Sequence, residues 1–335
     1  PMNSSAASDV YKRQTKYDTK LSVLDIVLTG SVNDVEIATG FQFRKEEYDV
    51  SRNEDSIATF DESGALLSFA DLIFLGGGIE SASDRSAYAV FVEAAKQATD
   101  RLELRGALRA ENLDTDSTIN PKVSMRFEAN DNLVLRGSIS TSFREASLSQ
   151  LNNSQVGLQG IQDFDSSGNP VGQASFIRVA QALSKDLKPE ESTNINFGAV
   201  WNPADNLSVK LDYWSIDYED VITIESAQGK VIANPTGPDI LRLSDGTLIG
   251  VTSKYKNASE VNTDGYDIEA SYRIDSSIGL INLGINRAHM LSYEIPAPGG
   301  GMKDVLGLFN HDNFARSLPE TKTVISASLI NGAHT

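Results

Sequence analysis

Polar and apolar residues alternate with a period of two along most of the chain. The alternation is clearest in residues 102–109, 133–140, 194–201, 207–214 and 267–274. No residue on the apolar face of these segments is charged, whereas nearly half of the residues on the other face are Arg, Lys, Asp or Glu. The period indicates β-strands with two different faces, and the uncharged face suits contact with lipid while the other lines a wet lumen.

The connections between strands are alternately short and long. Short polar turns rich in Asp, Asn and Ser lie at residues 99–101, 130–132, 203–206 and 275–277. Tight turns at one end and long loops at the other are typical of outer-membrane barrels. The long connections are residues 49–85, 145–190, 220–250 and 295–320.

Aromatic residues on the apolar face stand near the predicted strand ends. Phe127, Trp201 and Tyr272 are close to short turns, and Phe143 and Tyr266 are close to long loops. Two such rings of aromatic side chains are typical of the interfaces between a bilayer and water.

The pattern predicts about eleven strands, most of them long enough to cross a bilayer at a tilt. An odd number of strands does not close a single-chain bacterial barrel, so we expect a piece of a larger one. The expected strands are residues 19–30, 35–48, 86–98, 101–113, 119–129, 132–144, 191–202, 207–220, 248–274, 279–293 and 321–331.

Residues 1–14 do not fit this pattern. They contain no apolar stretch that a signal peptide would need, and Lys12 and Arg13 follow a Ser/Ala segment. The segment resembles a translated adapter sequence. We therefore expect a non-native or disordered lead over residues 1–14 and one partial β-barrel domain over residues 15–335.

Composition excludes several functional classes. The 46 acidic and 29 basic residues give a net charge of −17, which disfavours nucleic acid as a partner. There is no cysteine and there are three histidines, so thiolate metal sites and cysteine nucleophiles are ruled out. No apolar run is long enough for a transmembrane helix.

Catalytic or metal sites are not expected. The run Gly76-Gly77-Gly78 lacks the Lys-Ser/Thr of a phosphate loop and is interpreted as a flexible loop tip. The histidines His289, His311 and His334 are far apart in the sequence. Carboxylate pairs such as Asp217 with Glu219 could supply the two facing carboxyl groups that glycoside hydrolysis needs, but they fit the lumen face of a barrel better. The loop carboxylates Asp163, Asp165, Asp239 and Asp245 lack the spacing of a calcium loop and are interpreted as solvated.

Several strings of residues resemble the barrel of TonB-dependent outer-membrane receptors, in the same order. They are Asn120-Pro121-Lys122, Ser142-Phe143-Arg144, Lys188-Pro189-Glu190 and the stretch from Asn257 to Ile268 that contains Asp264-Gly265-Tyr266. The resemblance covers about residues 35–330. It implies an all-β, antiparallel transmembrane β-barrel, of which this chain supplies about eleven strands of a 22-strand type, with the plug domain absent.

The resemblance also implies a function. A receptor of this family binds a scarce, bulky solute such as a ferric siderophore, cobalamin or an oligosaccharide, and imports it across the outer membrane. The partners would be outer-membrane lipid and the TonB–ExbB–ExbD complex, which supplies energy through the missing plug. No enzyme activity, cofactor or metal is expected.

Solute would be bound by the long loops, here residues 145–190, 221–247 and 295–320. Two other interpretations stay open: a passive porin-like channel and a soluble secreted β-protein such as a lectin or glycosidase. The loop residues predicted to contact solute are Asn152, Asn153, Gln155, Gln159, Phe164 and Phe176.

Overall fold

The computed structural model describes residues 15–60, 66–68, 77–114, 116–297, 300–308 and 319–332. Most of these residues form one antiparallel sheet of twelve strands, which we call the wall. The predicted lead over residues 1–14 lies outside the described residues. The wall strands are β1 (Thr15–Val32), β2 (Val35–Arg52), β5 (Ser81–Thr99), β6 (Leu102–Asn112), β7 (Ser117–Asn130), β8 (Leu133–Arg144), β11 (Glu190–Ala204), β12 (Leu207–Ile224), β15 (Tyr255–Ser276), β16 (Gly279–Pro296), β17 (Met302–Asp304) and β18 (Thr321–Ile330).

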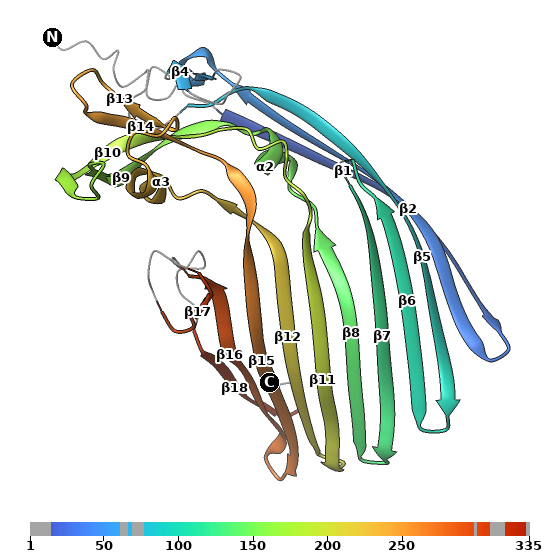
Figure 1. Cartoon of the computed structure of the whole chain (residues 1–335). Coiled ribbons are helices and arrows are strands. Elements are labelled where there is room, and N and C mark those ends of the chain that lie inside the picture. The colour runs from blue at the N-terminus through green and yellow to red at the C-terminus, as the bar shows by residue number, and fades with distance from the viewer. Residues whose placement is uncertain are drawn as a thin grey trace.

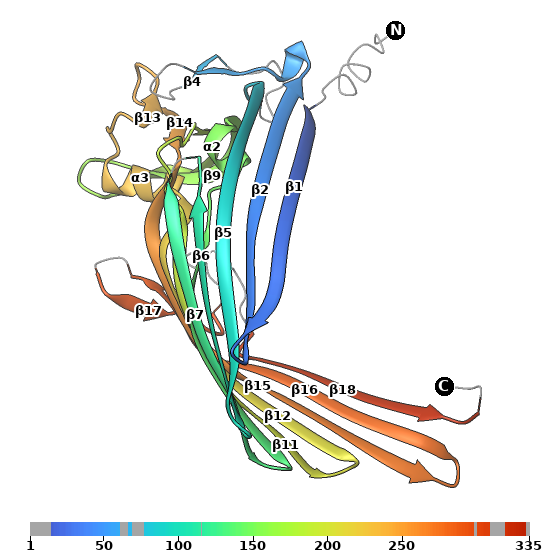
Figure 2. The ribbon, with the colours of Figure 1, turned by 90° about the vertical axis from the view of Figure 1, so that its right-hand side faces the viewer.

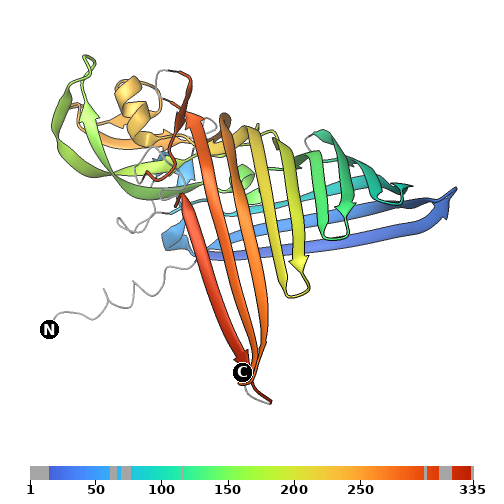
Figure 3. The same cartoon turned by 90° about the horizontal axis from the view of Figure 1, so that it is seen from below.

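The wall is a meander in which each strand from β1 to β16 pairs with the next wall strand along the chain (Figure 1). The order runs β1-β2-β5-β6-β7-β8-β11-β12-β15-β16, and both β17 and β18 then pair with β16. The sheet curves without closing, with β1 and β18 toward its opposite edges (Figures 2 and 3). Eleven of the twelve strands correspond to the eleven predicted ones, which confirms the barrel-type meander.

One predicted strand was wrong in its bounds. The expected strand over residues 248–274 is interrupted at Lys254, so only β15 belongs to the wall. Residues Leu248–Ser253 form β14 of a separate small sheet. The apolar content of Leu248 and Val251 serves the core of that sheet, which is why the sequence pattern runs on without a visible break.

Tight turns lie at one end of the wall and the long connections at the other (Figure 1). Two-residue turns join β1 to β2, β5 to β6, β7 to β8, β11 to β12 and β15 to β16. At the first of them Asn33 and Asp34 have φ values of 48° and 62°. Successive left-handed residues give a hairpin turn whose twist matches that of the strands, and Asn and Asp tolerate this conformation. The predicted arrangement of short and long connections is confirmed.

The two faces of the wall differ as the alternation predicts. Leu211 is 47% exposed, and its antiparallel partners Ala199 and Ile268 share its face. The aromatic side chains of Phe127, Trp201 and Tyr272 are exposed on this same face near the tight turns. Most charged residues of these strands lie on the opposite face, which lines the hollow described below. The prediction that Asp217 and Glu219 fit a lumen face was wrong, because the alternation of β12 places both on the face of Leu211, near the long-loop end. The apolar face is therefore the outward one.

Beyond the long-loop end of the wall lies a small folded unit, which we call the cap. It contains a four-stranded sheet in the order β13-β14-β10-β9, in which β10 and β14 are parallel. The connection between β8 and β11 supplies two of these strands, and the connection between β12 and β15 supplies the other two (Figure 1). The cap elements are α2 (Leu148–Asn152), β9 (Gln155–Phe164), β10 (Pro170–Gln181), α3 (Ala227–Ala233), β13 (Ile240–Arg242) and β14 (Leu248–Ser253).

The cap has its own hydrophobic core. Val231 of α3 and Val251 of β14 are almost fully buried, and they pack with Ile161 of β9 and with Ile177 and Val179 of β10. Burying five such side chains stabilises the contact between the two connections by several kcal/mol, at about 1.5–3 kcal/mol for each fully buried aliphatic side chain. In the part of the chain that the structure describes, no helix is long and apolar enough to cross a membrane.

The connection between β2 and β5 also reaches the cap. It contains the short helix η1 (Glu54–Ser56) and the strands β3 (Thr59–Phe60) and β4 (Leu66–Ser68). Gly78 is buried and bridges Ile57 on one side and Gln155 of β9 on the other. A Cβ at Gly78 would lie 2.4 Å from the carbonyl oxygen of Ser154. The prediction of a flexible tip at Gly76-Gly77-Gly78 was therefore wrong for Gly77 and Gly78: both are buried, the Gly77 carbonyl accepts from the backbone nitrogen of Val156, and Gly78 has no room for a Cβ. Gly76 lies outside the described residues.

Candidate functional site

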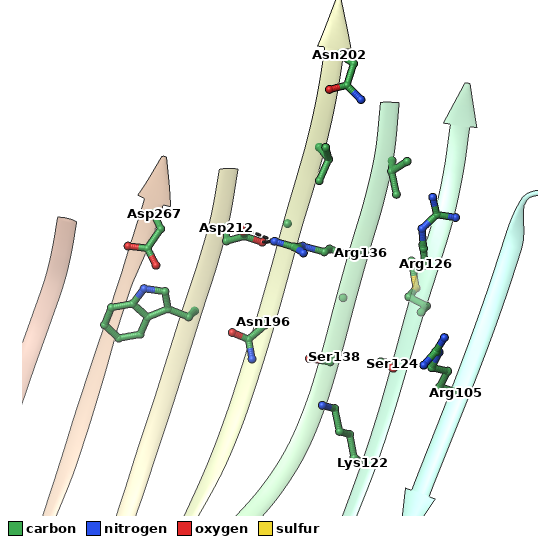
Figure 4. A pocket seen from close by; sticks show the side chains of 16 residues that line it. Arg105, Lys122, Ser124, Arg126, Arg136, Ser138, Asn196, Asn202, Asp212 and Asp267 are labelled. Carbon is green, nitrogen blue, oxygen red and sulfur yellow. Dashed lines mark hydrogen bonds and ion pairs between the residues drawn. The ribbon is translucent and has the colours of Figure 1, made fainter. Parts of the chain in front are cut away.

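The polar face of the wall contains a hollow of about 850 Å³. It extends across β6, β7, β8, β11, β12 and β15 (Figure 4). Its lining is mostly polar or charged, as a water-filled lumen requires and as the sequence predicts. The charged side chains in the lining are Arg105, Lys122, Arg126, Arg136, Asp212 and Asp267.

An ion pair crosses the middle of this hollow. Arg136 of β8 donates three hydrogen bonds to Asp212 of β12, at 2.9 Å from Nε to Oδ1, 2.7 Å from Nη2 to Oδ1 and 2.6 Å from Nη2 to Oδ2. Gly198 of β11 is the partner of both residues in the strand register, so the pair passes directly over it (Figure 4). A Cβ at Gly198 would collide with the Asp212 carboxylate. Glycine is therefore required here by the space that the ion pair occupies.

Further ion pairs follow the same face. Lys210 of β12 contacts Glu269 of β15 at 3.0 Å, and Arg126 contacts Glu128 at 2.6 Å within β7. These residues are partly exposed, so each pair contributes at most about 1 kcal/mol to stability. Their effect is mainly to keep the lumen face hydrated and charged.

A more buried charge network lies where β2, β5 and β6 approach the cap. Arg85 of β5 contacts Glu46 of β2 at 2.6 Å and Glu145, the residue after β8, at 3.3 Å. Arg44 contacts Glu111 at 3.0 Å. Burial raises the pKa of the Glu145 carboxyl, although Arg85 acts in the opposite direction. This network fixes the start of the β8–β11 connection to the wall.

The motifs that carried the resemblance meet at the rim of the wall. Arg144 of the Ser-Phe-Arg string donates to Glu190 of the Lys-Pro-Glu string, at 2.5 Å from Nε and 2.7 Å from Nη2. Glu190 also accepts a hydrogen bond of 2.7 Å from the backbone nitrogen of Ile222. Asn257, at the start of the third string, bonds to both the backbone nitrogen and the backbone oxygen of Lys188. Each long connection of the cap is therefore held by polar contacts where it leaves or rejoins the wall.

Two polar clamps join the halves of the cap. Arg242 of β13 donates to both oxygens of Asp163 in β9, at 2.7 and 2.8 Å. These hydrogen bonds hold the pKa of Asp163 below its ordinary value. The amide of Gln228 in α3 exchanges two hydrogen bonds with the backbone of Gln162, at 2.8 and 2.9 Å. Together with the shared core, these contacts make the two connections one unit.

The residues predicted to bind solute all lie in the cap but do not form a single pocket. Phe164 packs against the cap core, and Asn153 is buried beside Gln181, whose side chain reaches its backbone oxygen at 3.3 Å. The Asn152 amide donates to the backbone of α2. Gln155 contacts the side chain of Gln181 at 3.3 Å.

The remaining two predicted residues are exposed. Phe176 of β10 is 80% exposed, and Gln159 of β9 is also accessible. Gln159 is the register partner of Ile177, so strand alternation places it on the face opposite Phe176. Gln155 is exposed as well, but its amide contacts Gln181. The contact of Arg144 with Glu190 at the rim was not predicted from the sequence, although the Ser-Phe-Arg and Lys-Pro-Glu strings contain these two residues.

The loop carboxylates have protein partners. Asp163 contacts Arg242, Asp239 contacts Lys230 at 2.8 Å, and Asp165 and Asp245 accept backbone N–H bonds within their turns. The hydrogen bonds of these turns lower the pKa of Asp165 and Asp245. No group of three or more His, Cys, Asp or Glu residues with metal-binding geometry occurs among the residues described. His311 and His334 lie outside those residues.

A family model described as "TonB dependent receptor-like, beta-barrel" matches residues 2–313. The chain belongs to the TonB-dependent receptor family. Members of this family are transporters and not enzymes. Membership removes the soluble lectin or glycosidase interpretation. No curated protein matches the sequence.

Solved structures of TonB-dependent receptors and related transporters have the same fold. A variant of the ferric enterobactin receptor of Pseudomonas aeruginosa has a TM-score of 0.58 at 16% identity, over 83% of this chain and 36% of that one. The siderophore receptor PirA of Acinetobacter baumannii has a TM-score of 0.57 at 14% identity, over 93% of this chain and 47% of that one. The copper transporter OprC has a TM-score of 0.56 at 15% identity, over 95% of this chain and 42% of that one. This TonB-dependent receptor barrel chain thus spans less than half the length of each.

Proposed function

We propose that this chain forms part of the barrel and outer cap of an outer-membrane receptor that imports a bulky solute with energy supplied through TonB. The observation that carries the proposal is the wall itself, with a mostly apolar outward face and a charged face that lines a hollow. Such a wall suits a bilayer on one side and a wet passage on the other. The TonB–ExbB–ExbD complex would act through the plug of the complete receptor.

The solute class proposed first is a ferric siderophore. The ferric enterobactin receptor and PirA share this fold and are siderophore receptors by name, whereas OprC is a copper transporter. Cobalamin and oligosaccharides are the other solutes of the proposed class. We place the first contact with solute on the cap, at the exposed surfaces of Gln159 and Phe176. The two side chains lie on opposite faces of the β9–β10 pair. The exposed ring of Phe176 suits a flat group of a bulky ligand, and the amide of Gln159 suits a polar group.

The test is solute uptake by the receptor that carries this chain. The receptor is expressed in a Gram-negative host without its own siderophore receptors, with or without functional TonB, and offered labelled ferric siderophores, cobalamin and oligosaccharides. We expect the receptor in the outer-membrane fraction and saturable uptake of one solute only when TonB is functional. Uptake that proceeds equally without TonB would favour the porin-like channel, and absence from the outer membrane would refute the proposal.

Variants of the cap refine the same assay. Phe176→Ala is expected to weaken solute binding several-fold, whereas Val171→Ala, another exposed apolar residue of β10, serves as the matched control. Equal binding by both variants and the unaltered receptor would remove Phe176 from the proposed contact surface.

A further inference from the structure

The outward face of the wall from β6 to β18 has one basic residue between its two aromatic levels. The lower level is that of Phe127, Trp201 and Tyr272, and the upper level is that of Phe143 and Tyr266. The basic residue is Arg287 of β16. The other outward positions of the described strands in this band bear no Lys or Arg, and the outward carboxylates Asp217 and Asp264 lie near its upper edge.

The strand register shows that Arg287 faces outward. Its direct partners are Ile268 of β15 and Thr323 of β18. Ile268 in turn pairs with Leu211, which is exposed on the outward face. The neighbouring positions alternate as they must: Ala288 pairs with Asp267, which lines the hollow. Directly paired residues share a face of a sheet, so Arg287 is on the lipid side.

The height of Arg287 on the wall corresponds to the outer part of the apolar band. It lies nine residues after Ile278 of the tight turn. Along β16 it is four residues from Leu283, the partner of Tyr272 in the lower aromatic level, and two residues from His289, the partner of Tyr266 in the upper level. From this height an arginine reaches the outer head-group region with its long side chain.

The surroundings of Arg287 supply no anionic partner. The Nε atom of Arg287 is buried and has no hydrogen-bond partner among the described residues. Asp264, the nearest outward carboxylate on β15, accepts hydrogen bonds from the hydroxyls of Tyr213 and Ser292. Glu320 lies 3.9 Å from Nε2 of His289. No ion pair with Arg287 is formed in this part of the wall.

Next to Arg287 is a group of side chains that suits the interface. The rings of Tyr266 and His289 are 4.9 Å apart, and Nδ1 of His289 is 2.7 Å from the hydroxyl of Thr321. His289 and Arg287 are two residues apart on β16, so their side chains are neighbours on one face. Aromatic rings at the head-group level beside a cation and hydroxyls form a surface for a polar lipid head group.

We propose that Arg287 binds the phosphate of an anionic lipid in the outer leaflet. The proposal rests on the proposed outer-membrane location of the receptor. A guanidinium at the edge of an apolar band is costly unless it meets a counter-charge, and a phosphate accepts its fork of N–H donors in a bidentate way. Tyr266, His289 and Thr321 would border the same head group.

The experiment measures binding of lipid A, which carries phosphates, to the delipidated receptor in a mild detergent. Bound lipid is counted by native mass spectrometry over a concentration series. We expect Arg287→Gln to weaken lipid A binding about tenfold or more, because hydrogen bonds to charged groups contribute about 1.5–3 kcal/mol and 1.4 kcal/mol is tenfold. Arg287→Lys should retain part of the affinity. The control is Lys96→Gln, which removes an outward-facing cation of β5 near the tight-turn end and should leave binding unchanged.

Other outcomes overturn the inference. Equal lipid A binding by Arg287→Gln and the unaltered receptor would do so, as would equally strong binding of dephosphorylated lipid A. Full competition by inorganic phosphate would indicate a free phosphate site and not a lipid site. Loss of binding in Glu320→Gln as large as in Arg287→Gln would indicate an internal pair. Outer-membrane fractionation and TonB-dependent uptake of the same variants show separately whether the proposed function holds.

Discussion

Replacing Leu211 by arginine tests which face of the wall meets lipid. Leu211 lies five residues after the turn at residues 205–206. A rise of about 3.3 Å per residue and a tilt of about 40° place it about 13 Å above the turn, near the middle of an apolar band about 25 Å tall. Its paired neighbours Ala199 and Ile268 offer no counter-charge. An arginine at the midplane of a membrane barrel costs about 2–4 kcal/mol, so we expect Leu211→Arg to lower the free energy of unfolding by that amount.

The matched control lies one residue away on the opposite face. Lys210 pairs with Glu269 at 3.0 Å, and both side chains are more than two-fifths exposed. Lys210→Ala should therefore cost at most about 1 kcal/mol. The assay is guanidinium unfolding of the receptor in phospholipid vesicles, followed by the fluorescence of Trp201 and Trp214. Equal costs for the two variants, or a cost below about 1 kcal/mol for Leu211→Arg, would refute the assignment of the outward face.

Three further changes test the lumen, the cap and the rim. Gly198→Ala should displace the carboxylate that lies above it, so Arg136→Gln should have almost no additional effect in a double-mutant cycle of unfolding free energies. Because Arg242 lowers the pKa of Asp163, their contact stabilises the cap above the unfolded pKa of about 3.9 and is lost as the pH falls through the lower, folded value. Limited proteolysis should therefore cut the cap faster below about pH 4, and Asp163→Asn should remove this pH dependence and weaken the cap at neutral pH. Glu190→Gln should cost about 1–3 kcal/mol and speed proteolysis of residues 145–189, and unchanged cleavage would contradict a role for Glu190 in holding this connection.

The wall follows closely from the sequence because its determinants are local. Alternation at residues 207–214 fixes both the strand and its two faces, and polar two-residue turns such as Asp205-Asn206 fix the connections. Each strand pairs with the next long strand, so no distant partner has to be found. The charged face then becomes the lumen face as a direct consequence of the period.

The cap does not follow from the sequence because its determinants are distant. The parallel pairing of β10 with β14 joins Arg178 to Gly250, across two wall strands and the whole of α3. Ile177 and Val251 look like ordinary apolar loop residues until both connections fold together. Phe164 was predicted to bind solute for the same reason: an aromatic residue in a long loop gives no sign that it packs against a core supplied by another loop.

The distribution of exposed apolar surface explains why lipid is the required solvent for the outward face. Phe197 is 55% exposed and Val123 is 58% exposed, on a wall whose other face bears ion pairs. No second sheet covers this apolar face in the described residues, and the buried clusters lie at the cap and the rim. A soluble monomer rarely leaves an apolar patch of more than a few hundred Å² exposed, whereas this patch extends over many strands. The wall is therefore stable only with hydrocarbon against one face and water against the other, and a charge such as Arg287 on the hydrocarbon side calls for an anionic head group.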